Sequence, residues 1–233
     1  KAADIGCAMG KTGTDVAKGA ADMILTDDNF STIVAAVREG RGIYDNIRKA
    51  VHFLLSCNLG EILTVFSAML LWRHSPLLPI QLLWLNLITD SLPALALGVE
   101  SPEADIMRRA PRTQREGLFS GGVGLQAIWQ GVMFAVLTLI AYYVGAIVWN
   151  DTLLGSTMAF ATLAIAQILH AFNIRSSHSL FKVGFHTNKT MLLAAAGSLV
   201  LMLAVMLIPG VQGVFSLVPM SAAAWGVVLC LAI

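Results

Sequence analysis

Two carboxylates near the middle of long apolar runs are the residues of this sequence best suited to chemistry. Glu61 is the only Asp, Glu, Lys or Arg residue between positions 50 and 72, and Asp90 is the only one between positions 79 and 99. An ionisable side chain deep in a membrane is costly unless it is paired or solvated, so it is a functional-site hypothesis by default. The alternative is a structural role, in which each carboxylate is protonated or hydrogen-bonded to a neighbouring helix.

Polar residues accompany both carboxylates at helical spacing. Asn58 lies three residues before Glu61. Asn86 lies four residues before Asp90, which directly follows Thr89. Residues three or four positions apart share a helix face, so the two runs offer carboxylate, amide and hydroxyl oxygens. Calcium takes about six to eight hard oxygen ligands of these kinds. The pattern predicts a cation site made of Asn58, Glu61, Asn86, Thr89 and Asp90.

Other features of the two runs bear on which cation would bind. No His or Cys stands at the five positions, which argues against zinc and copper. Cys57 precedes Asn58 but projects about 100° around the helix from it, so it is a poor ligand candidate. Pro93 removes a helical hydrogen bond near Asp90 and frees a backbone carbonyl there. Interrupted helices of this kind are typical of ion sites in transporters.

The elements that must position these residues are transmembrane helices. Of 233 residues, 57% are hydrophobic and only 12% are charged, and the mean hydropathy is +0.74. Soluble domains carry about 25% charged residues, so lipid is the expected solvent. The net charge of +1 provides no basic field for nucleic acid. The sequence therefore predicts a mainly α, polytopic membrane protein with the lipid bilayer as its partner and no nucleic acid.

Apolar runs alternate with short polar links after residue 50. A helix needs about 20 apolar residues to cross the hydrocarbon core of a bilayer. We therefore predict a transmembrane domain over residues 51–233 with about six spans. Their predicted bounds are 51–72, 79–99, 121–149, 152–174, 190–209 and 221–233, the last of which is too short to span and is expected to be truncated.

The links differ in charge from one side to the other. Basic residues gather in the links at 100–119 and 175–189, whereas Arg73 is the only one in the links of the opposite side. Positive residues concentrate in cytoplasmic loops, so the N-terminal segment, on the basic side, is predicted to be cytoplasmic. The basic residues are Arg108, Arg109, Arg112 and Arg115 in the first link and Arg175, Lys182 and Lys189 in the second.

The first 50 residues differ from the rest and are typical of a soluble α/β segment. Short apolar strands are expected up to Gly10 and at 23–25, with a helix between them. A second helix begins near Ser31 and can run on toward the membrane, so we predict an α/β segment over residues 1–30 and a stalk helix over residues 31–50. The stretch from Gly6 to Thr12 resembles a phosphate-binding Walker A loop, but three residues rather than four separate its glycines, and we reject that interpretation.

Several segments together resemble the P-type cation-transporting ATPases. The first three are similar to the end of the Rossmann-like α/β phosphorylation domain of that family, and the later ones to its stalk, sixth membrane helix and following cytoplasmic loop. The resemblance is dense over residues 1–119 and implies that residues 51–233 hold membrane helices five to ten. The segments are DIGCAMG (4–10), GTDVAK (13–18), ADMILTDDNF (21–30), the stretch 32–46, LLWLNLITD (82–90) and DIMRRAPR (105–112).

Within this family the sequence resembles endoplasmic-reticulum-type and bacterial calcium pumps, because sodium/potassium pumps carry Asp where Asn86 stands. One departure concerns the eighth membrane helix, in which the two-calcium pumps have a carboxylate. The run at 167–173 aligns there and places Gln167 at that position. A neutral amide donates an oxygen to a cation but adds no charge, so Gln167 joins the predicted ligands and the second calcium site is in doubt. A hydrogen bond between helices is the alternative role of Gln167.

The resemblance implies the membrane part of an ATP-driven calcium translocase. The full-length parent would use ATP and magnesium and transport calcium, but the phosphorylated Asp, the nucleotide domain and the first four membrane helices are missing from this sequence. The implied partner is therefore the rest of the same polypeptide, and no catalytic residue, no cofactor-binding residue and no obligatory protein partner is expected. Because the chain begins at Lys1 without Met and stops inside an apolar run, we expect it to be a piece of a longer protein.

Two other functions stay open on the sequence alone. One is a sodium/potassium- or proton-type pump of the same family. The other is a secondary transporter or channel with intramembrane carboxylates, although such proteins have no need of a segment like residues 1–50. The short link at 150–151 favours a bacterial source, and the location would then be the cell membrane.

Overall fold

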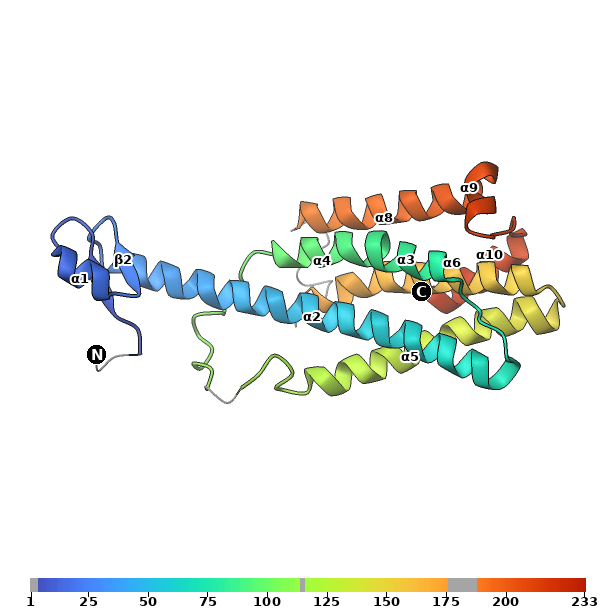
Figure 1. Ribbon diagram of the computed structural model, residues 1–233, viewed down its shortest axis with the longest axis horizontal. Helices are drawn as coiled ribbons and strands as arrows, with labels where there is room; N and C mark the ends of the chain where they lie inside the picture. The colour runs from blue at the N-terminus through green and yellow to red at the C-terminus, as the bar shows by residue number, and fades with distance from the viewer. Residues whose placement is uncertain (1–3, 114–115, 176–187) are drawn as a thin grey trace. The chain divides into compact units, whose positions relative to one another are not determined.

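The computed structural model describes residues 4–113, 116–175 and 188–233 (Figure 1). Arg115 and Lys182, which contributed to the predicted orientation, lie outside these ranges. The chain divides into two compact units, Lys1–Asp45 with Ser101–Pro111, and Asn46–Glu100 with Arg112–Ile233. The first unit therefore includes most of the predicted stalk and a later loop, in addition to the α/β segment.

The start of the first unit is a small β-α-β element. Strands β1 (Cys7–Met9) and β2 (Met23–Leu25) pair in parallel, and helix α1 (Asp15–Ala20) connects them. Parallel strands need such a crossover because the end of the first strand and the start of the second lie at opposite edges of the sheet. The Thr14 hydroxyl begins α1 by accepting a hydrogen bond from the Ala17 N–H. The predicted strand–helix–strand order of this segment is confirmed.

In the stretch that resembles a Walker A loop, the hydrogen-bond donors bind a carboxylate of the protein itself. The backbone N–H groups of Lys11 and Thr12 both donate to the Asp28 carboxylate at 2.8 Å, and so does the Thr12 hydroxyl. The hydrogen bond from the Lys11 backbone is the largest cause that lowers the pKa of Asp28 to about 2. A Cβ on Gly10 would lie 2.7 Å from the Leu25 carbonyl oxygen, so close backbone packing explains this glycine.

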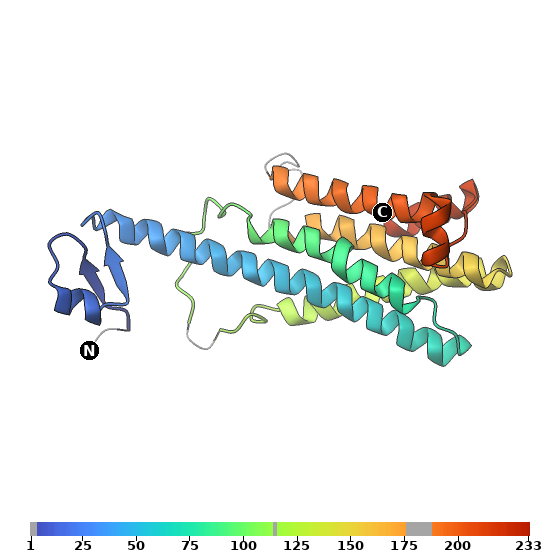
Figure 2. The ribbon, with the colours of Figure 1, turned by 45° about the horizontal axis from the view of Figure 1, so that its top comes forward.

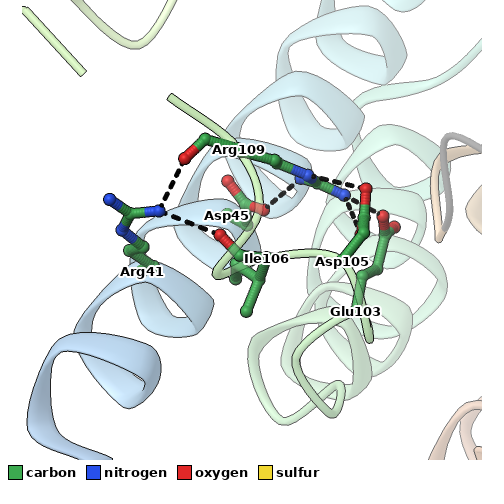
Figure 3. A network of polar contacts seen from close by, with 6 residues as sticks. All are labelled: Arg41, Asp45, Glu103, Asp105, Ile106 and Arg109. Atoms are coloured by element: carbon green, nitrogen blue, oxygen red, sulfur yellow. Dashed lines mark hydrogen bonds and ion pairs between the residues drawn. The ribbon is translucent and has the colours of Figure 1, made fainter. Parts of the chain in front are cut away.

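Helix α2 (Ser31–Trp72) is continuous over 42 residues, so the predicted stalk and the predicted first span are one helix. Its early turns hold the loop Ser101–Pro111 of the first unit (Figure 3). Arg41 donates from Nη1 to the carbonyl oxygens of Ile106 and Arg109, each at 3.0 Å. Hydrogen bonding to Asp105 is the largest cause that raises the pKa of the Arg109 guanidinium. Arg109 pairs with the carboxylates of Asp45, Glu103 and Asp105.

The second unit is a bundle of helices (Figures 1 and 2). Within the described ranges, five helical stretches are long and apolar enough to cross a membrane, and α10 is apolar but shorter. This confirms a mainly α, multi-pass membrane fold. Besides α2, the elements are α3 (Pro79–Trp84), η1 (Leu85–Asp90), α4 (Ser91–Gly98), α5 (Val123–Tyr143), η2 (Val144–Val148), α6 (Thr152–Ile174), α8 (Lys189–Leu207), α9 (Pro209–Val214) and α10 (Ala222–Ala232).

Helix α6 is the centre of this bundle. Of the most apolar 18 consecutive residues of α6, 78% are buried. In the other four stretches that are long and apolar enough to cross a membrane, the corresponding share is 33–44%. It packs against α5, α8, α10 and η1. Asp151 begins the helix by accepting a hydrogen bond from the Leu154 N–H at 3.0 Å. Side chains on α6 are therefore placed to meet polar groups from several other helices.

Candidate cation-binding site

The helix that carries Asp90 changes its winding at the predicted site. Between α3 and α4 lies η1, a π-helical segment in which hydrogen bonds join residues five positions apart. Pro93, one turn later, has no N–H to donate to the preceding turn, and the Ser91 hydroxyl donates to the Asn86 carbonyl oxygen at 3.0 Å. Such π-helical turns are frequent at functional sites. The irregular segment contains three of the predicted ligands, Asn86, Thr89 and Asp90.

Glu61 is the point at which three helices meet. It lies on α2 and is 5% exposed. Asn86 of η1 donates from Nδ2 to one of its carboxylate oxygens at 2.6 Å, and Gln167 of α6 donates from Nε2 to the other at 3.2 Å. The structure thus brings together three of the predicted ligands from parts of the chain that are far apart in sequence. Both amides present nitrogen, not oxygen, to Glu61.

Within the described ranges, Asp90 is buried without amide groups that donate hydrogen bonds to its carboxylate. Its side chain is fully buried, and among the residues that the structure describes no nitrogen or oxygen group donates a hydrogen bond to either carboxylate oxygen; its polar neighbour is the Cys57 thiol. The Thr89 hydroxyl and the side-chain oxygen of Gln167 likewise have no hydrogen-bond partner in the described part of the chain. Buried polar atoms nearly always have partners, so a group of unpaired oxygens needs an explanation. Carboxylate, hydroxyl and amide oxygens are the donor set that suits a hard cation such as calcium.

Asn58 is the predicted ligand that the structure connects least to the others. It is half-buried on α2, and its Nδ2 donates back to the Leu54 carbonyl oxygen at 2.7 Å. Within the described part of the chain, no hydrogen bond joins Asn58 to another predicted ligand. This internal bond engages the amide nitrogen only.

Cys57 lies closer to the site than its angle to Asn58 indicated. Its side chain is fully buried and interacts electrostatically with both Glu61 and Asp90. The available signal was its spacing of four residues before Glu61, which places both on one face of α2. The approach of Asp90 comes from another helix, and no spacing within α2 could predict it.

A second polar contact between α2 and α6 lies near Gln167. His170, three residues after Gln167, is 3% exposed and has Nε2 3.2 Å from the Ser56 hydroxyl. Its ring stacks on Phe53 with centroids 6.2 Å apart and meets Phe134 edge to face at 5.0 Å. These contacts fix the face of α6 that presents Gln167 to Glu61.

Charge at the candidate site comes from two carboxylates. Over the described ranges, no group of three or more His, Cys, Asp or Glu side chains is arranged to hold a metal ion. A cation at this position would therefore depend on Glu61 and Asp90 for charge and on neutral oxygens for the remaining ligands.

Comparison with known proteins places the chain in a family. A family model described as "Cation transporting ATPase, C-terminus" matches residues 74–233. A protein named calcium-transporting ATPase 1 from Bacillus cereus is 47% identical over 250 aligned residues, which cover 100% of this chain and 28% of that protein. The calcium-transporting ATPase of Bacillus subtilis is 45% identical over 98% of this chain and 26% of its own length.

The likeness extends to eukaryotic relatives. An endoplasmic reticulum calcium ATPase from Aspergillus fumigatus is 36% identical over 99% of this chain and 27% of its own length. The chain therefore spans between a quarter and a third of the length of these relatives. It belongs to the family of P-type cation-transporting ATPases and corresponds to their C-terminal part.

Proposed function

We propose that this chain is the membrane part of an ATP-driven calcium pump and that Glu61 and Asp90 are its central cation ligands. The observation that carries the proposal is the fully buried Asp90 carboxylate, which accepts no hydrogen bond from a nitrogen or oxygen group within the described residues. A divalent cation would supply the missing compensation for two buried negative charges. The names of the related calcium-transporting ATPases support calcium as that cation.

The neutral ligands would act by rotating their side chains. The Asn86 and Gln167 amides donate from nitrogen to Glu61. A rotation of each amide by about 180° would turn its oxygen toward a cation bound between Glu61 and Asp90. Release of the cation would restore the hydrogen bonds to Glu61. The same side chains would therefore stabilise the buried carboxylate with and without the ion.

The remaining ligands would complete the oxygen set. The Thr89 hydroxyl and the Asn58 side-chain oxygen are the further donors that we assign to the site. Energy for transport would come from ATP, with magnesium, through domains that this chain does not contain. The partners of the chain would be the rest of the same polypeptide and the lipid bilayer, with the N-terminal segment in the cytoplasm and the cell membrane as the location in a bacterium.

Cation-dependent phosphorylation of the full-length protein tests this function. We expect phosphorylation from ATP to require calcium and to be absent when sodium or potassium replaces calcium in the assay as the only added cation beside magnesium. Phosphorylation driven by sodium or potassium, or occurring without any of the three, would instead favour a sodium/potassium- or proton-type pump.

A further inference from the structure

An ion pair between a buried arginine and a half-buried glutamate lies beyond the end of α4, away from the candidate cation site. Arg175, which follows α6, is 1% exposed and donates from Nε to the Glu100 carboxylate at 2.9 Å. Asn188, which precedes α8, donates from Nδ2 to the same carboxylate oxygen at 2.5 Å. One carboxylate thus joins the ends of three helices that are far apart in sequence. We call Glu100, Arg175 and Asn188 the anchor.

Further hydrogen bonds strengthen this junction. Asn188 also caps α8, because its Oδ1 accepts from the Met191 N–H at 2.9 Å. Asn46 of α2 donates from Nδ2 to the carbonyl oxygens of Gly98 and Glu100, at 3.2 and 2.7 Å. The carbonyl groups at a helix end lack partners within the helix, and Asn46 satisfies that of Gly98 together with the Glu100 carbonyl just beyond the helix. The end of α4 is therefore held by α2, α6 and α8 together.

An ion pair such as the anchor holds helices together only at a cost in desolvation free energy. Two charges removed from water are costly, and a well-packed apolar pair is often as stable as a buried ion pair. An ion pair with these hydrogen bonds adds geometric specificity, because its distances and angles are satisfied only when the three helix ends are correctly placed. This points to a positional role.

The positions of the anchor residues along the helices connect them to the cation ligands. Glu100 lies ten residues after Asp90, and Arg175 lies eight residues after Gln167. At 1.5 Å per residue these separations correspond to about 15 and 12 Å of helix. The stretch between Asp90 and the anchor is α4, which packs against α8. The stretch between Gln167 and the anchor is the last part of α6.

We propose that the anchor of Glu100, Arg175 and Asn188 positions the cation ligands by fixing the helix that carries Asp90 against α6 and α8, and so sets the apparent affinity of the pump for calcium. Helix α4 (Ser91–Gly98) alone separates Asp90 from the end that the anchor holds, so a shift of that end would move Asp90. The anchor residues do not touch the cation. They are positioning residues, and the inference depends on the proposed calcium transport.

The test uses the full-length pump in membranes. Glu100→Gln should raise the calcium concentration for half-maximal phosphorylation by ATP about tenfold, which corresponds to a modest loss of binding free energy. Phosphorylation from inorganic phosphate without calcium should stay at the wild-type level, because it does not require the loaded site. A residue with only a structural role would change the two readouts together through loss of active protein.

Asn188→Ser provides a milder variant that is expected to fold. Serine keeps the helix cap of α8. It is too short to reach Glu100, so the contact with Glu100 is lost together with the 3.4 Å hydrogen bond from Asn188 to the Ala96 carbonyl oxygen. We expect the calcium concentration for half-maximal phosphorylation to rise about threefold. If Glu100→Gln does not accumulate in membranes, the calcium dependence of Asn188→Ser decides between the two outcomes. Wild-type calcium dependence of Asn188→Ser would overturn the proposal.

A matched control separates the anchor from general destabilisation of α6. Asp151→Ala removes the cap at the other end of the same helix and leaves the anchor intact. It should leave the calcium dependence within about twofold of wild type; an equal shift in this variant would refute a positional role. If calcium does not stimulate phosphorylation of the wild-type protein, the proposed function fails. The role of the anchor is then tested by measuring, for the same variants, the half-maximal concentration of the cation that does drive phosphorylation.

Discussion

At the residue scale, the two buried carboxylates are stabilised in different ways. Glu61 accepts hydrogen bonds from Asn86 and Gln167 at its two oxygens, so a structural role would account for it. Asp90 has no such partners among the described residues, although it is fully buried. A carboxylate that only held helices together would be expected to form hydrogen bonds with them. A purely structural role therefore explains Asp90 less well than Glu61.

Replacing Asp90 by Asn tests this difference. The substitution keeps the size of the side chain but removes one of two negative charges that would balance a divalent ion. We expect Asp90→Asn in the full-length pump to abolish calcium-dependent phosphorylation from ATP and to leave phosphorylation from inorganic phosphate largely intact. Asp151→Asn is the control, since it neutralises an exposed carboxylate and keeps the helix cap. Normal calcium affinity in Asp90→Asn would remove Asp90 from the ligand set.

Gln167 bears on the number of ions bound. Its amide is 3.2 Å from Glu61 and contributes no charge. With Glu61 and Asp90 as the carboxylates of this chain at the site, we expect the pump to bind one calcium ion, because charge count helps to set calcium affinity. Gln167→Glu adds a carboxylate beside Glu61 and should raise bound radioactive calcium per phosphorylatable pump from one toward two.

The comparison for that measurement is Gln167→Asn, which keeps an amide and should not raise the number of bound ions. Two calcium ions per pump in the wild type, bound cooperatively, would contradict the one-ion expectation.

At the scale of the elements, α2 and α5 approach closely beside the candidate site. Gly60 and Gly131 form this contact: a Cβ on Gly60 would lie 2.8 Å from the Phe134 Cβ, and a Cβ on Gly131 would lie 2.9 Å from the Leu59 side chain. Glycine allows two helices to pack at short range in a membrane. Gly60 precedes Glu61, so the spacing of α2 and α5 influences where that carboxylate lies.

Gly131→Ala should separate the two helices slightly. Overpacking of a tight contact typically costs about 1–3 kcal/mol, so we expect faster thermal inactivation of the solubilised full-length protein. Gly226→Ala in α10 is the control, because nothing lies within 4 Å of its added Cβ. Equal inactivation rates for wild type, Gly131→Ala and Gly226→Ala would show that the contact is less tight than it is in the structure.

At the scale of the whole molecule, the predicted orientation in the membrane can be tested at two exposed positions. Cys7 is an exposed cysteine of the first unit, and Thr152 is exposed at the start of α6. In a variant without other cysteines, a membrane-impermeant thiol reagent should label Cys7 only from the cytoplasmic side. Thr152→Cys on a background without Cys7 should be labelled only from the opposite side. Labelling of both from one side would contradict the predicted orientation.

The sequence by itself determined the membrane fold, the helical stretches and the two intramembrane carboxylates. These follow from local properties, since the length of an apolar run and the position of a charge within it can be read along the chain. The predicted run at 79–99 is found as the consecutive elements α3, η1 and α4 for this reason.

Tertiary structure decided which atoms meet. The contact between Gln167 and Glu61 joins residues 106 positions apart, and the approach of Asp90 to Cys57 comes from two different helices. Such pairings depend on how whole helices pack and rotate against one another, which no local spacing specifies. The same cause explains why Glu61 has its hydrogen bonds and Asp90 lacks them among the described residues, although both look alike in the sequence.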